Sequence, residues 1–389
     1  MCSAYLTSLK IQGGRQLKHH PESVPRGHGN SHEGQLPPRI IAWELTRACN
    51  LKCVHCRATA VDQRDAGEYS TADALALIQE TADYCQDKPY KPMIILTGGE
   101  PLVREDIFSV AEACVTAGFR TVMAPNGTLL TEEIARRLKE LGVAGLSISL
   151  DAADAEVHDA FRGVDGAFVG ALQGMASARS AGLPFQINST ITRRNRQHLA
   201  DLLNLAVEQG ARLLDVFMLV PTGRGEGIRP EELTPEEYED VIEWVYEQSR
   251  TAPIGVKTTC APHYTRVFRQ KGGLQDAAAG GKGGHGPGGG SGCMAGTSFM
   301  FISHVGEVYP CGYFPVPAGS LREDSFEDVW ENSPLFNRLR DRQQLQGKCG
   351  DCEFKAVCGG CRARALSAYG DYMHAEPLCT YVPKGHNPD

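Results

Sequence analysis

The sequence lacks an excess of positive charge, since 39 lysines and arginines stand against 47 aspartates and glutamates in 389 residues, a net charge of −8. This balance argues against a general nucleic-acid-binding protein, which usually carries a basic surface. No apolar run approaches the roughly 18 residues that a membrane-spanning helix needs. The N-terminus also lacks an apolar core followed by a small-residue cleavage site. We therefore expect no secretory signal and a cytoplasmic location.

Cysteine, by contrast, is abundant, with 14 in the chain. Without a secretory signal, a disulfide framework is a poor explanation. Most of the cysteines gather at residues 49–56 and 349–379. Thiols at such short spacings in a reducing compartment indicate metal or iron–sulfur cluster ligation. Cys85 and Cys114 stand apart on expected helix faces and are predicted to lie in the core, and Cys2 is predicted to lie at the surface.

Short apolar runs alternate with amphipathic segments between residues 39 and 220. The predicted strands are 39–45, 93–99, 120–126, 145–151, 184–191 and 213–219, and the predicted helices are 70–86, 104–117, 131–141, 167–181 and 196–209. Near-continuous apolar strands in this alternation predict an α/β fold with a parallel sheet buried on both faces. Six such units indicate a partial (β/α)6 TIM-like barrel, with its chemistry at the C-terminal ends of the strands.

Composition divides the chain into four expected regions. Residues 1–37 form an N-terminal arm without periodicity, and residues 38–260 form the partial barrel. Residues 261–292 form a connector with a Gly-rich loop that has no core of its own. Residues 293–389 form a cysteine-rich domain that depends on its metals for stability. A further helix is expected at 235–250, inside the barrel region.

The stretch "RACNLKCVHC" places Cys49, Cys53 and Cys56 directly after the first predicted strand. A [4Fe–4S] cluster has four irons, so three thiolates leave one iron open to a small chelating molecule. A zinc site that takes a distant fourth ligand is the alternative. The second strand ends in "LTGGEP", where two glycines allow a close backbone approach to a ligand and Glu100 adds a carboxylate acceptor.

The CxxxCxxC spacing after the first strand and "GGEP" after the second resemble the radical S-adenosylmethionine (SAM) superfamily over residues 39–260. The resemblance implies that the open iron binds the amino and carboxylate groups of SAM. Gly98, Gly99 and Glu100 would hold the amino group, and His55 is the aromatic residue before the third cysteine. The reduced cluster would cleave SAM to methionine and a 5′-deoxyadenosyl radical, which removes an unactivated hydrogen from the substrate.

Polar residues at or just after the ends of the later strands are further candidates for the SAM site. They are Asn126, Ser149, Asp151, Arg162 and Asn188. The resemblance implies that Ser149 and Asn188 contact the ribose or the methionine. It also implies that Arg162 pairs with the SAM carboxylate, for which a planar guanidinium is suited. The alternative for each of these residues is a capping or turn position.

The C-terminal cysteines form a second pattern, with two close pairs separated by only five residues. This gap is too short for a zinc ribbon, and the pattern resembles a SPASM auxiliary-cluster domain with one residue fewer than usual between Cys358 and Cys361. Seven SPASM cysteines leave one place open in two cubane clusters, so Cys260 is a candidate eighth ligand, or else a small buried apolar residue. The expected sets, both closed and suited to electron transfer, are Cys260, Cys293, Cys311 and Cys361, and Cys349, Cys352, Cys358 and Cys379.

Several motifs together resemble the haem synthases of the sirohaem-dependent haem pathway, among them "HCRA", "MAPNGTL", "LVPTGRG" and "TCAPHY". The resemblance implies oxidative decarboxylation of two propionates of Fe-coproporphyrin III to the vinyl groups of haem b, with a flavodoxin or ferredoxin as electron donor. The alternatives are a didecarboxysirohaem deacetylase, an enzyme of haem d1 biosynthesis and a peptide-modifying maturase. A non-enzymatic iron–sulfur scaffold would need neither "GGEP" nor an open iron.

A substrate with four propionates calls for cationic anchors. The candidates near the expected barrel mouth are Arg47, Arg57, Arg224, His263 and Arg266. Arginine pairs with a carboxylate through two parallel hydrogen bonds. A solvated surface position is the alternative for each arginine. His263 and Tyr264 are also candidates for contact with the porphyrin iron or face.

Overall fold

The computed structural model describes residues 35–273 and 292–386. The chain separates into Met1–Gln35 and Leu36–Asp389, and the second unit is the one described here. The predicted arm lies almost wholly outside the described residues, as do Cys2 and most of the predicted Gly-rich loop. Among the described residues, no helix is long and apolar enough to cross a membrane.

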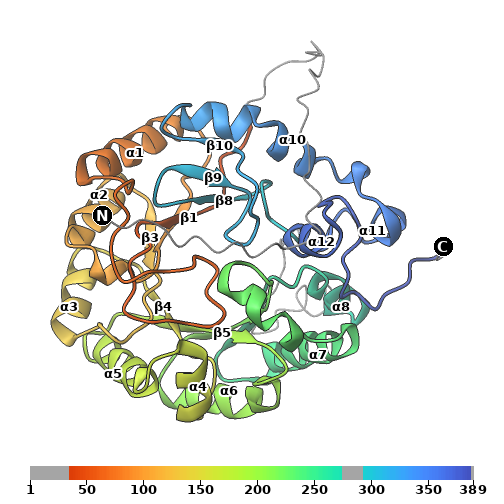
Figure 1. Cartoon of the computed structure of the whole chain (residues 1–389), viewed down its shortest axis with the longest axis horizontal. Coiled ribbons are helices and arrows are strands. Elements are labelled where there is room, and N and C mark those ends of the chain that lie inside the picture. Colours follow the sequence, from red (N-terminus) through yellow and green to blue (C-terminus); the bar gives the residue numbers. More distant parts are fainter. Residues whose placement is uncertain (1–34, 274–291, 387–389) are drawn as a thin grey trace, which may run out of the picture. The chain divides into compact units, whose positions relative to one another are not determined.

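A ten-stranded sheet is the framework, in the order β10-β9-β8-β1-β2-β3-β4-β5-β6-β7 (Figure 1). Its strands are β1 (Ile40–Glu44), β2 (Met93–Thr97), β3 (Arg120–Met123), β4 (Leu146–Ser149), β5 (Phe185–Ile191), β6 (Leu213–Met218), β7 (Gly255–Thr259), β8 (Phe299–Ile302), β9 (Glu307–Tyr309) and β10 (Gly319–Ser320). The strands from β8 through β1 to β7 are parallel. The predicted α/β fold with a parallel barrel sheet is therefore confirmed.

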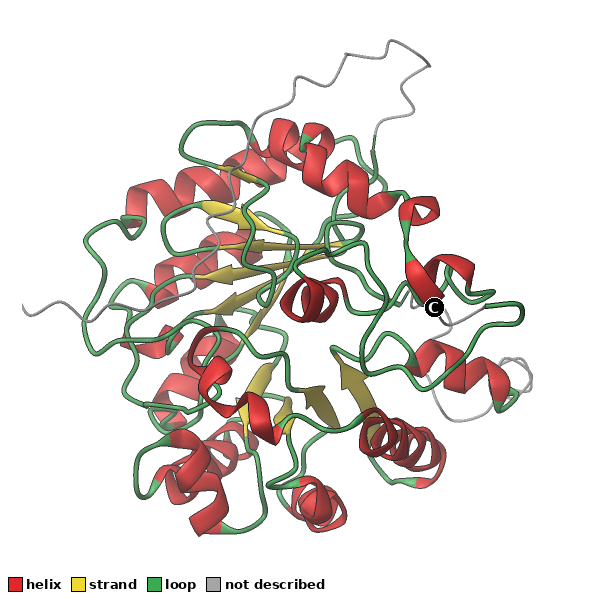
Figure 2. Cartoon of the chain, turned by 45° about the vertical axis from the view of Figure 1, so that its right-hand side comes forward, coloured by secondary structure: helices red, strands yellow, loops and turns green. Residues whose placement is uncertain are grey.

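The barrel helices lie outside the strands, as Figure 2 shows. Those of the barrel are α1 (Thr71–Tyr84), α2 (Ile107–Thr116), α3 (Glu132–Glu140), α4 (Ala155–Arg162), α5 (Ala167–Ser180), α6 (Leu199–Glu208) and α7 (Pro235–Thr251). After β7 come α8 (Tyr264–Gln270), α10 (Pro334–Arg340), α11 (Gly347–Asp351) and α12 (Arg362–Tyr369). Helix starts follow the local signals: Ser70 forms a capping box with Asp73, Thr131 accepts from the Ile134 amide, and Thr234 pairs with Glu237 ahead of Pro235.

The sheet extends beyond the six predicted strands at both edges. β7 pairs in parallel with β6. At the other edge β8, from the cysteine-rich region, pairs in parallel with β1, and β9 and β10 continue from it in antiparallel fashion. The main-chain ladder thus crosses the predicted boundary between barrel and cysteine-rich domain. The boundaries at residues 260 and 292 themselves stay predictions.

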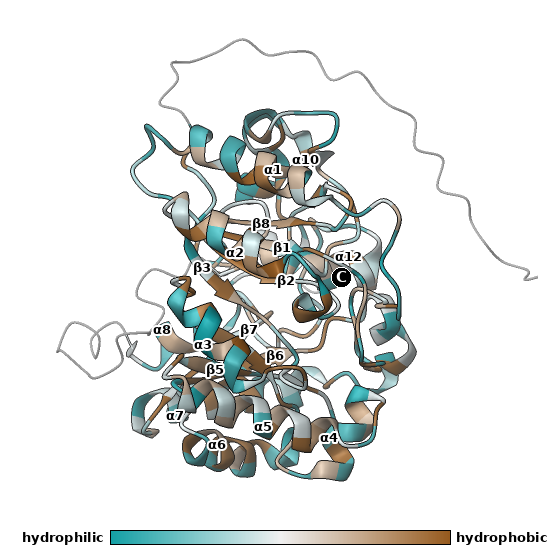
Figure 3. Ribbon diagram, turned by 90° about the vertical axis from the view of Figure 1, so that its left-hand side faces the viewer, coloured by the Kyte–Doolittle hydropathy of each residue, from teal (hydrophilic) through white to brown (hydrophobic). Residues whose placement is uncertain are grey.

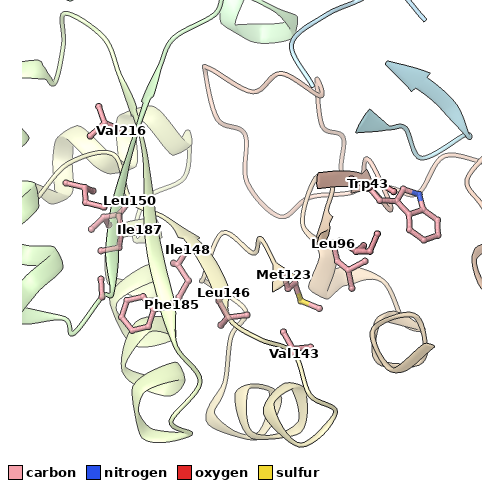
Figure 4. Packing of buried hydrophobic residues seen from close by; sticks show 14 of the residues in the cluster. Trp43, Leu96, Met123, Val143, Leu146, Ile148, Leu150, Phe185, Ile187 and Val216 are labelled. Atoms are coloured by element: carbon pink, nitrogen blue, oxygen red, sulfur yellow. The ribbon is translucent and has the colours of Figure 1, made fainter. Parts of the chain in front are cut away.

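The two faces of the barrel strands differ in polarity, although continuous apolar strands were expected. Along β5, Phe185, Ile187 and Ile191 are buried, whereas the alternating Gln186 and Asn188 are half-buried. The buried face joins a large apolar cluster beneath the helices (Figure 4). Figure 3 shows the strands mostly in the brown of apolar residues, whereas α3 carries much of the teal of polar ones. Alternate residues of a strand point to opposite faces, so the face away from the helices carries polar side chains that a ligand can use.

One buried arginine ties the end of β1 to the next two elements. Arg104 donates to the Leu45 carbonyl at 2.8 Å and to the Tyr69 carbonyl at 2.9 Å, and it pairs with Asp106 at 2.6 Å. Its side chain is fully buried. Arg104 therefore fixes the chain on either side of the loop that carries the first three cysteines.

We predict that Arg104→Met lowers the free energy of unfolding by roughly 2–5 kcal/mol, because two buried carbonyls lose their donor. Urea titration of the anaerobically reconstituted enzyme measures this change. The control is Arg120→Met at the exposed first position of β3, which should change stability little. Equal stability of the two variants would show that Arg104 has no such role.

Candidate active site

The first three cysteines lie on the loop after β1, as predicted. Cys49, Cys53 and Cys56 pack together with Leu51 and Ala167. Burial, together with the charges of Glu100, Cys53 and Cys56, raises the pKa of the Cys49 thiol to about 12, against the effect of the hydrogen bond from the Leu51 amide. In the described part of the chain, no group of three or more His, Cys, Asp or Glu side chains has the arrangement that one metal ion requires.

Arginines predicted as substrate anchors instead hold the backbone of this loop. Arg224 donates to the Cys53 carbonyl at 2.8 Å and to the Ala60 carbonyl at 2.7 Å. Arg47 donates to the Thr59 carbonyl at 2.9 Å. Each guanidinium satisfies a carbonyl that the irregular loop leaves unpaired. The Arg47 Nε and one terminal nitrogen of Arg224 lack a partner among the described residues, so a substrate role for these arginines stays a prediction.

The two glycines of "GGEP" allow a close approach between the loops after β1 and β2. A Cβ at Gly98 would lie 2.6 Å from the Thr46 carbonyl oxygen, and one at Gly99 would overlap the Ala48 carbonyl. The Gly99 amide donates to Thr46 at 2.7 Å. In the sequence these glycines suggested close approach to a ligand, whereas here they pack against the cysteine loop itself.

Glu100 is fully buried beside the first cysteine loop. Its carboxylate accepts from the Asn126 amide at 2.6 Å and from the Leu102 amide at 3.0 Å. Burial raises the pKa of Glu100 to about 7, against the effect of these hydrogen bonds. Asn126 in turn donates from its side chain to Asn50 at 2.8 Å. Glu100 and Asn126 thus join the ends of β2 and β3 to the cysteine loop.

Arg162 connects this loop to the end of β4. Its guanidinium lies 2.8 Å from the Asp151 carboxylate and 3.8 Å from the Cys53 sulfur. Burial alone would raise the pKa of Asp151, but the Arg162 charge holds it below its usual value. His55 lies 3.9 Å from the same carboxylate, and the His158 ring accepts from the Asp151 amide at 3.1 Å. The guanidinium of Arg162 thus already pairs with Asp151 within the protein, and its contact with the SAM carboxylate stays a prediction.

Ser149 and Asn188 lie opposite each other on neighbouring strands. Both are half-buried on the polar face, and Asn188 accepts from Gln186 at 2.7 Å. With His55 and Arg162 they border the first cysteine loop from the strand ends. Three gathered thiols beside a buried guanidinium fit a negatively charged iron–sulfur cluster, and half-exposed amide and hydroxyl groups fit a polar ligand above it.

A second group brings together four cysteines that are far apart in the sequence. Burial raises the pKa of Cys260 well above its usual range, and the Cys361, Cys311 and Cys293 thiols contribute to that shift. Cys260 has a φ of 60°, which a non-glycine residue rarely adopts. Tyr238 holds its carbonyl with a hydrogen bond of 2.8 Å. Backbone strain that neighbouring contacts stabilise in this way is more typical of a ligand position than of a residue that only packs in the core.

A third group lines a cavity near the C-terminus. Cys349, Cys352, Cys358 and Cys379 surround it together with His263 and Arg266. Backbone amides already point at these sulfurs, from Glu376 to Cys349 at 3.3 Å and from Phe354 to Cys352 at 3.4 Å. The structure therefore gathers the two sets of four cysteines that were predicted. The Cys293 amide donates to the Cys358 carbonyl at 2.9 Å and so joins the two sets.

Sequence reasoning missed the ion pair that lies between these two groups. Arg364 lies 3.4 Å from Glu376 and donates to the Leu219 carbonyl at 3.0 Å. Glu376 also accepts from the Cys361 amide at 2.6 Å. Both side chains are nearly inaccessible. The signal was the arginine pair in "CRARA" directly after a cysteine.

The family model of the radical SAM superfamily matches residues 43–206, and that of an iron–sulfur cluster-binding domain, SPASM, matches residues 293–353. A protein of Methanosarcina barkeri named "AdoMet-dependent heme synthase" is 48% identical over 346 residues, which is 89% of this chain and 97% of that protein. The chain belongs to the radical SAM superfamily. Like other members it is an enzyme that uses a [4Fe–4S] cluster and SAM, and its SPASM domain binds auxiliary iron–sulfur clusters.

Other relatives of this radical SAM chain carry related names. A second "AdoMet-dependent heme synthase", from Nitratidesulfovibrio vulgaris, is 43% identical over 94% of this chain and 98% of that protein. The "Fe-coproporphyrin III synthase" of Methanosarcina barkeri is 30% identical over 89% of this chain and 88% of that protein. Among solved structures, Streptococcus suis SuiB bound to SAM has a TM-score of 0.68 at 19% identity, covering 89% of this chain and 78% of that one. This likeness shows the shared fold.

The remaining substrate candidates of this radical SAM enzyme fall in two places. Arg57 pairs with Glu44 at 2.9 Å and lies over the Phe301 ring at 4.3 Å, so its side chain contacts both of the neighbouring strands β1 and β8. Arg266 pairs with Glu239 at 2.6 Å, and Tyr264 is buried. Burial lowers the pKa of His263 to about 4. Because His263 and Arg266 line the third cysteine group, their position argues against anchoring substrate at the barrel mouth.

We predict that Gly99→Ala removes the first cluster, because the added Cβ displaces the Ala48 carbonyl and with it the cysteine loop. Iron analysis after anaerobic reconstitution should find about four fewer irons per chain, and SAM cleavage should be lost. Gly227→Ala is the matched control, since a Cβ there meets nothing within 4 Å. Wild-type iron content in Gly99→Ala would contradict the packing role.

We predict that Cys260→Ala also lowers the iron content, with loss of one auxiliary cluster. Cys114→Ala should leave iron unchanged, because Cys114 is a fully buried residue of the apolar core, as predicted. Iron analysis and EPR spectra of the reduced proteins measure both. An unchanged iron content in Cys260→Ala would show that Cys260 is a core residue and not a cluster ligand.

Proposed function

We propose that this enzyme decarboxylates two propionate side chains of Fe-coproporphyrin III to vinyl groups and so forms haem b. The observation that carries the proposal is the 48% identity over nearly the whole length of a protein named for haem synthesis. The similarity falls to 30% for the Fe-coproporphyrin III synthase of the same organism. The "HCRA" ending of the cysteine motif, with Arg57 after Cys56, supports the same choice.

Three cysteine groups suit the electron balance of this reaction. Bound SAM supplies a 5′-deoxyadenosyl radical, and each propionate gives up one hydrogen atom to it, one CO2 and one electron. Cys49, Cys53 and Cys56 would hold the cluster that binds SAM, with one iron open. The two sets of four cysteines would hold closed clusters, which can accept an electron without binding substrate. A flavodoxin or ferredoxin as the reductant stays a prediction.

The chain's own side chains prepare the first site for a charged cluster and for SAM. The buried Arg162 guanidinium lies against the Cys53 sulfur and would offset the negative charge of a thiolate-bound cluster. Ser149 and Asn188 would orient SAM through their half-buried polar groups. Glu100 accepts a hydrogen bond from the Asn126 backbone amide and so fixes the edge of this site. Its carboxylate does not reach into solvent.

Arg57 is the substrate candidate that fits best. It follows the ligand Cys56 directly, and its side chain is 19% exposed in the pair with Glu44. A Cβ at Gly312, the residue after Cys311, would lie 3.1 Å from the Arg57 Nε. Arg57 thus lies between the first and second cysteine groups, where a substrate must meet both the radical and the electron acceptor. A propionate could pair with the guanidinium there.

We predict that the anaerobically reconstituted enzyme, with SAM and reductant, converts Fe-coproporphyrin III to haem b and releases CO2. Mass spectrometry of the porphyrin measures the loss of two carboxyl groups. Parallel assays use didecarboxysirohaem and metal-free coproporphyrin. Cys56→Ala should abolish SAM cleavage, and Arg57→Gln should lower turnover of Fe-coproporphyrin III about tenfold or more while SAM cleavage without substrate is retained, since one charge-assisted pair contributes about 1.5–3 kcal/mol.

Other products would assign another function. Deacetylation of didecarboxysirohaem without decarboxylation of Fe-coproporphyrin III would make the chain a deacetylase. Absence of porphyrin binding would favour a peptide-modifying maturase. Retained SAM cleavage in Cys56→Ala would overturn the assignment of the first cluster.

A further inference from the structure

His263 is a buried histidine whose ring nitrogens have no hydrogen-bond partner among the described residues. It directly precedes α8, is 1% exposed and lines the cavity of the third cysteine group. Both of its ring nitrogens lack a hydrogen-bond partner. The ring packs edge-to-face on Tyr238, with centroids 4.4 Å apart. Burying an unpaired polar group costs about 1–3 kcal/mol, so a partner outside the polypeptide is the expected reason for a histidine here.

The other charged side chains that line this cavity are already paired. Arg266 pairs with Glu239, and the Lys355 ammonium donates to the Gly350 carbonyl at 3.0 Å. Lys348 donates to the Cys379 carbonyl. The Glu376 carboxylate accepts from the Cys361 amide and pairs with Arg364. Of the described polar side chains around the cavity, His263 is therefore the one with no hydrogen bond at all, although the Nε of the paired Arg266 also lacks a partner.

We propose that the His263 ring donates a hydrogen bond to an inorganic sulfide of the auxiliary cluster bound by Cys349, Cys352, Cys358 and Cys379. The proposal rests on the proposed function in one respect, namely that these four cysteines bind a cluster. The cysteine sulfurs receive backbone amides from Glu376, Phe354 and Gly360. None of these three amides is directed at an inorganic sulfide of the cluster. A neutral imidazole has one N–H, which it could donate to such a sulfide.

The consequence is a higher reduction potential for this cluster. Hydrogen bonds to the sulfurs stabilise the reduced form, which carries one more negative charge, and hydrogen bonding is one of the factors that set the potential of iron–sulfur clusters. A higher potential makes the cluster a better acceptor for the electrons that the substrate loses. His263 is then a positioning residue of the electron-transfer centre and not a ligand of the porphyrin iron.

The first test is a redox titration of the fully reconstituted enzyme, followed by EPR. In His263→Phe, one auxiliary cluster should show a more negative midpoint potential at wild-type iron content. His263→Gln keeps an N–H donor, so its midpoint potential should lie between those of the wild type and of His263→Phe. His198→Phe, a histidine of the barrel at Arg196–His198, should titrate as the wild type. An unchanged potential in His263→Phe with full iron content would overturn the proposal.

A second test leaves His263 in place and so does not depend on how a His263 variant folds. The chain is labelled with 15N-histidine and carries Cys49→Ala, Cys53→Ala and Cys56→Ala, which removes the cluster next to His55. Pulsed EPR of the reduced protein should detect one weakly coupled histidine nitrogen, and its absence would overturn the proposal. Wild-type iron content and EPR signals in Cys352→Ala would instead show that the cluster assignment has failed, independently of His263.

Discussion

Buried negative charge is the constraint on which this structure depends. Each cysteine group lies largely away from water, where burial disfavours the thiolate and raises the pKa of thiols such as Cys49 and Cys260. Cluster ligation requires the thiolate. Iron supplies most of the compensation, and the protein adds a buried donor at each group. Arg162 lies against Cys53, Arg362 lies 3.9 Å from the Cys349 sulfur, and Arg364 lowers the pKa of Cys361.

These buried cations also hold distant parts of the chain together. Arg162 joins α4 to the loop after β1, and Arg364 joins α12 to the end of β6 through the Leu219 carbonyl. The pairing of β8 with β1 attaches the cysteine-rich region to the barrel by main-chain hydrogen bonds. As a result, the second cysteine group draws Cys260 from the end of β7 and Cys311 from the chain after β9. The polar face of the strands is enclosed between these groups.

Glycine at the site allows neighbouring loops to approach one another closely. The space that a side chain of Gly98 or Gly99 would fill is occupied by Thr46 and Ala48, and the contact of this backbone with SAM stays a prediction. The same holds for Gly223, where a Cβ would overlap the Arg57 carbonyl. Loops that carry the cysteines are thus pressed against one another without side chains between them. A fixed loop keeps its thiols at the spacing that a rigid cluster requires.

Local pattern alone determined the strand and helix order, the helix caps at Ser70 and Thr234, and which cysteines are candidate ligands, because these depend on residues a few positions apart. The tertiary structure decided what the arginines do. In the sequence, Arg47, Arg224 and Arg266 were equivalent cations for a carboxylate substrate, but each has a carbonyl or carboxylate partner within the protein. The tertiary structure also extended the sheet through β7 and β8 and placed Asp151 next to Arg162. Such partners are far apart in the sequence, 171 residues for Arg224 and Cys53, and only the packing of the chain brings them within hydrogen-bond distance.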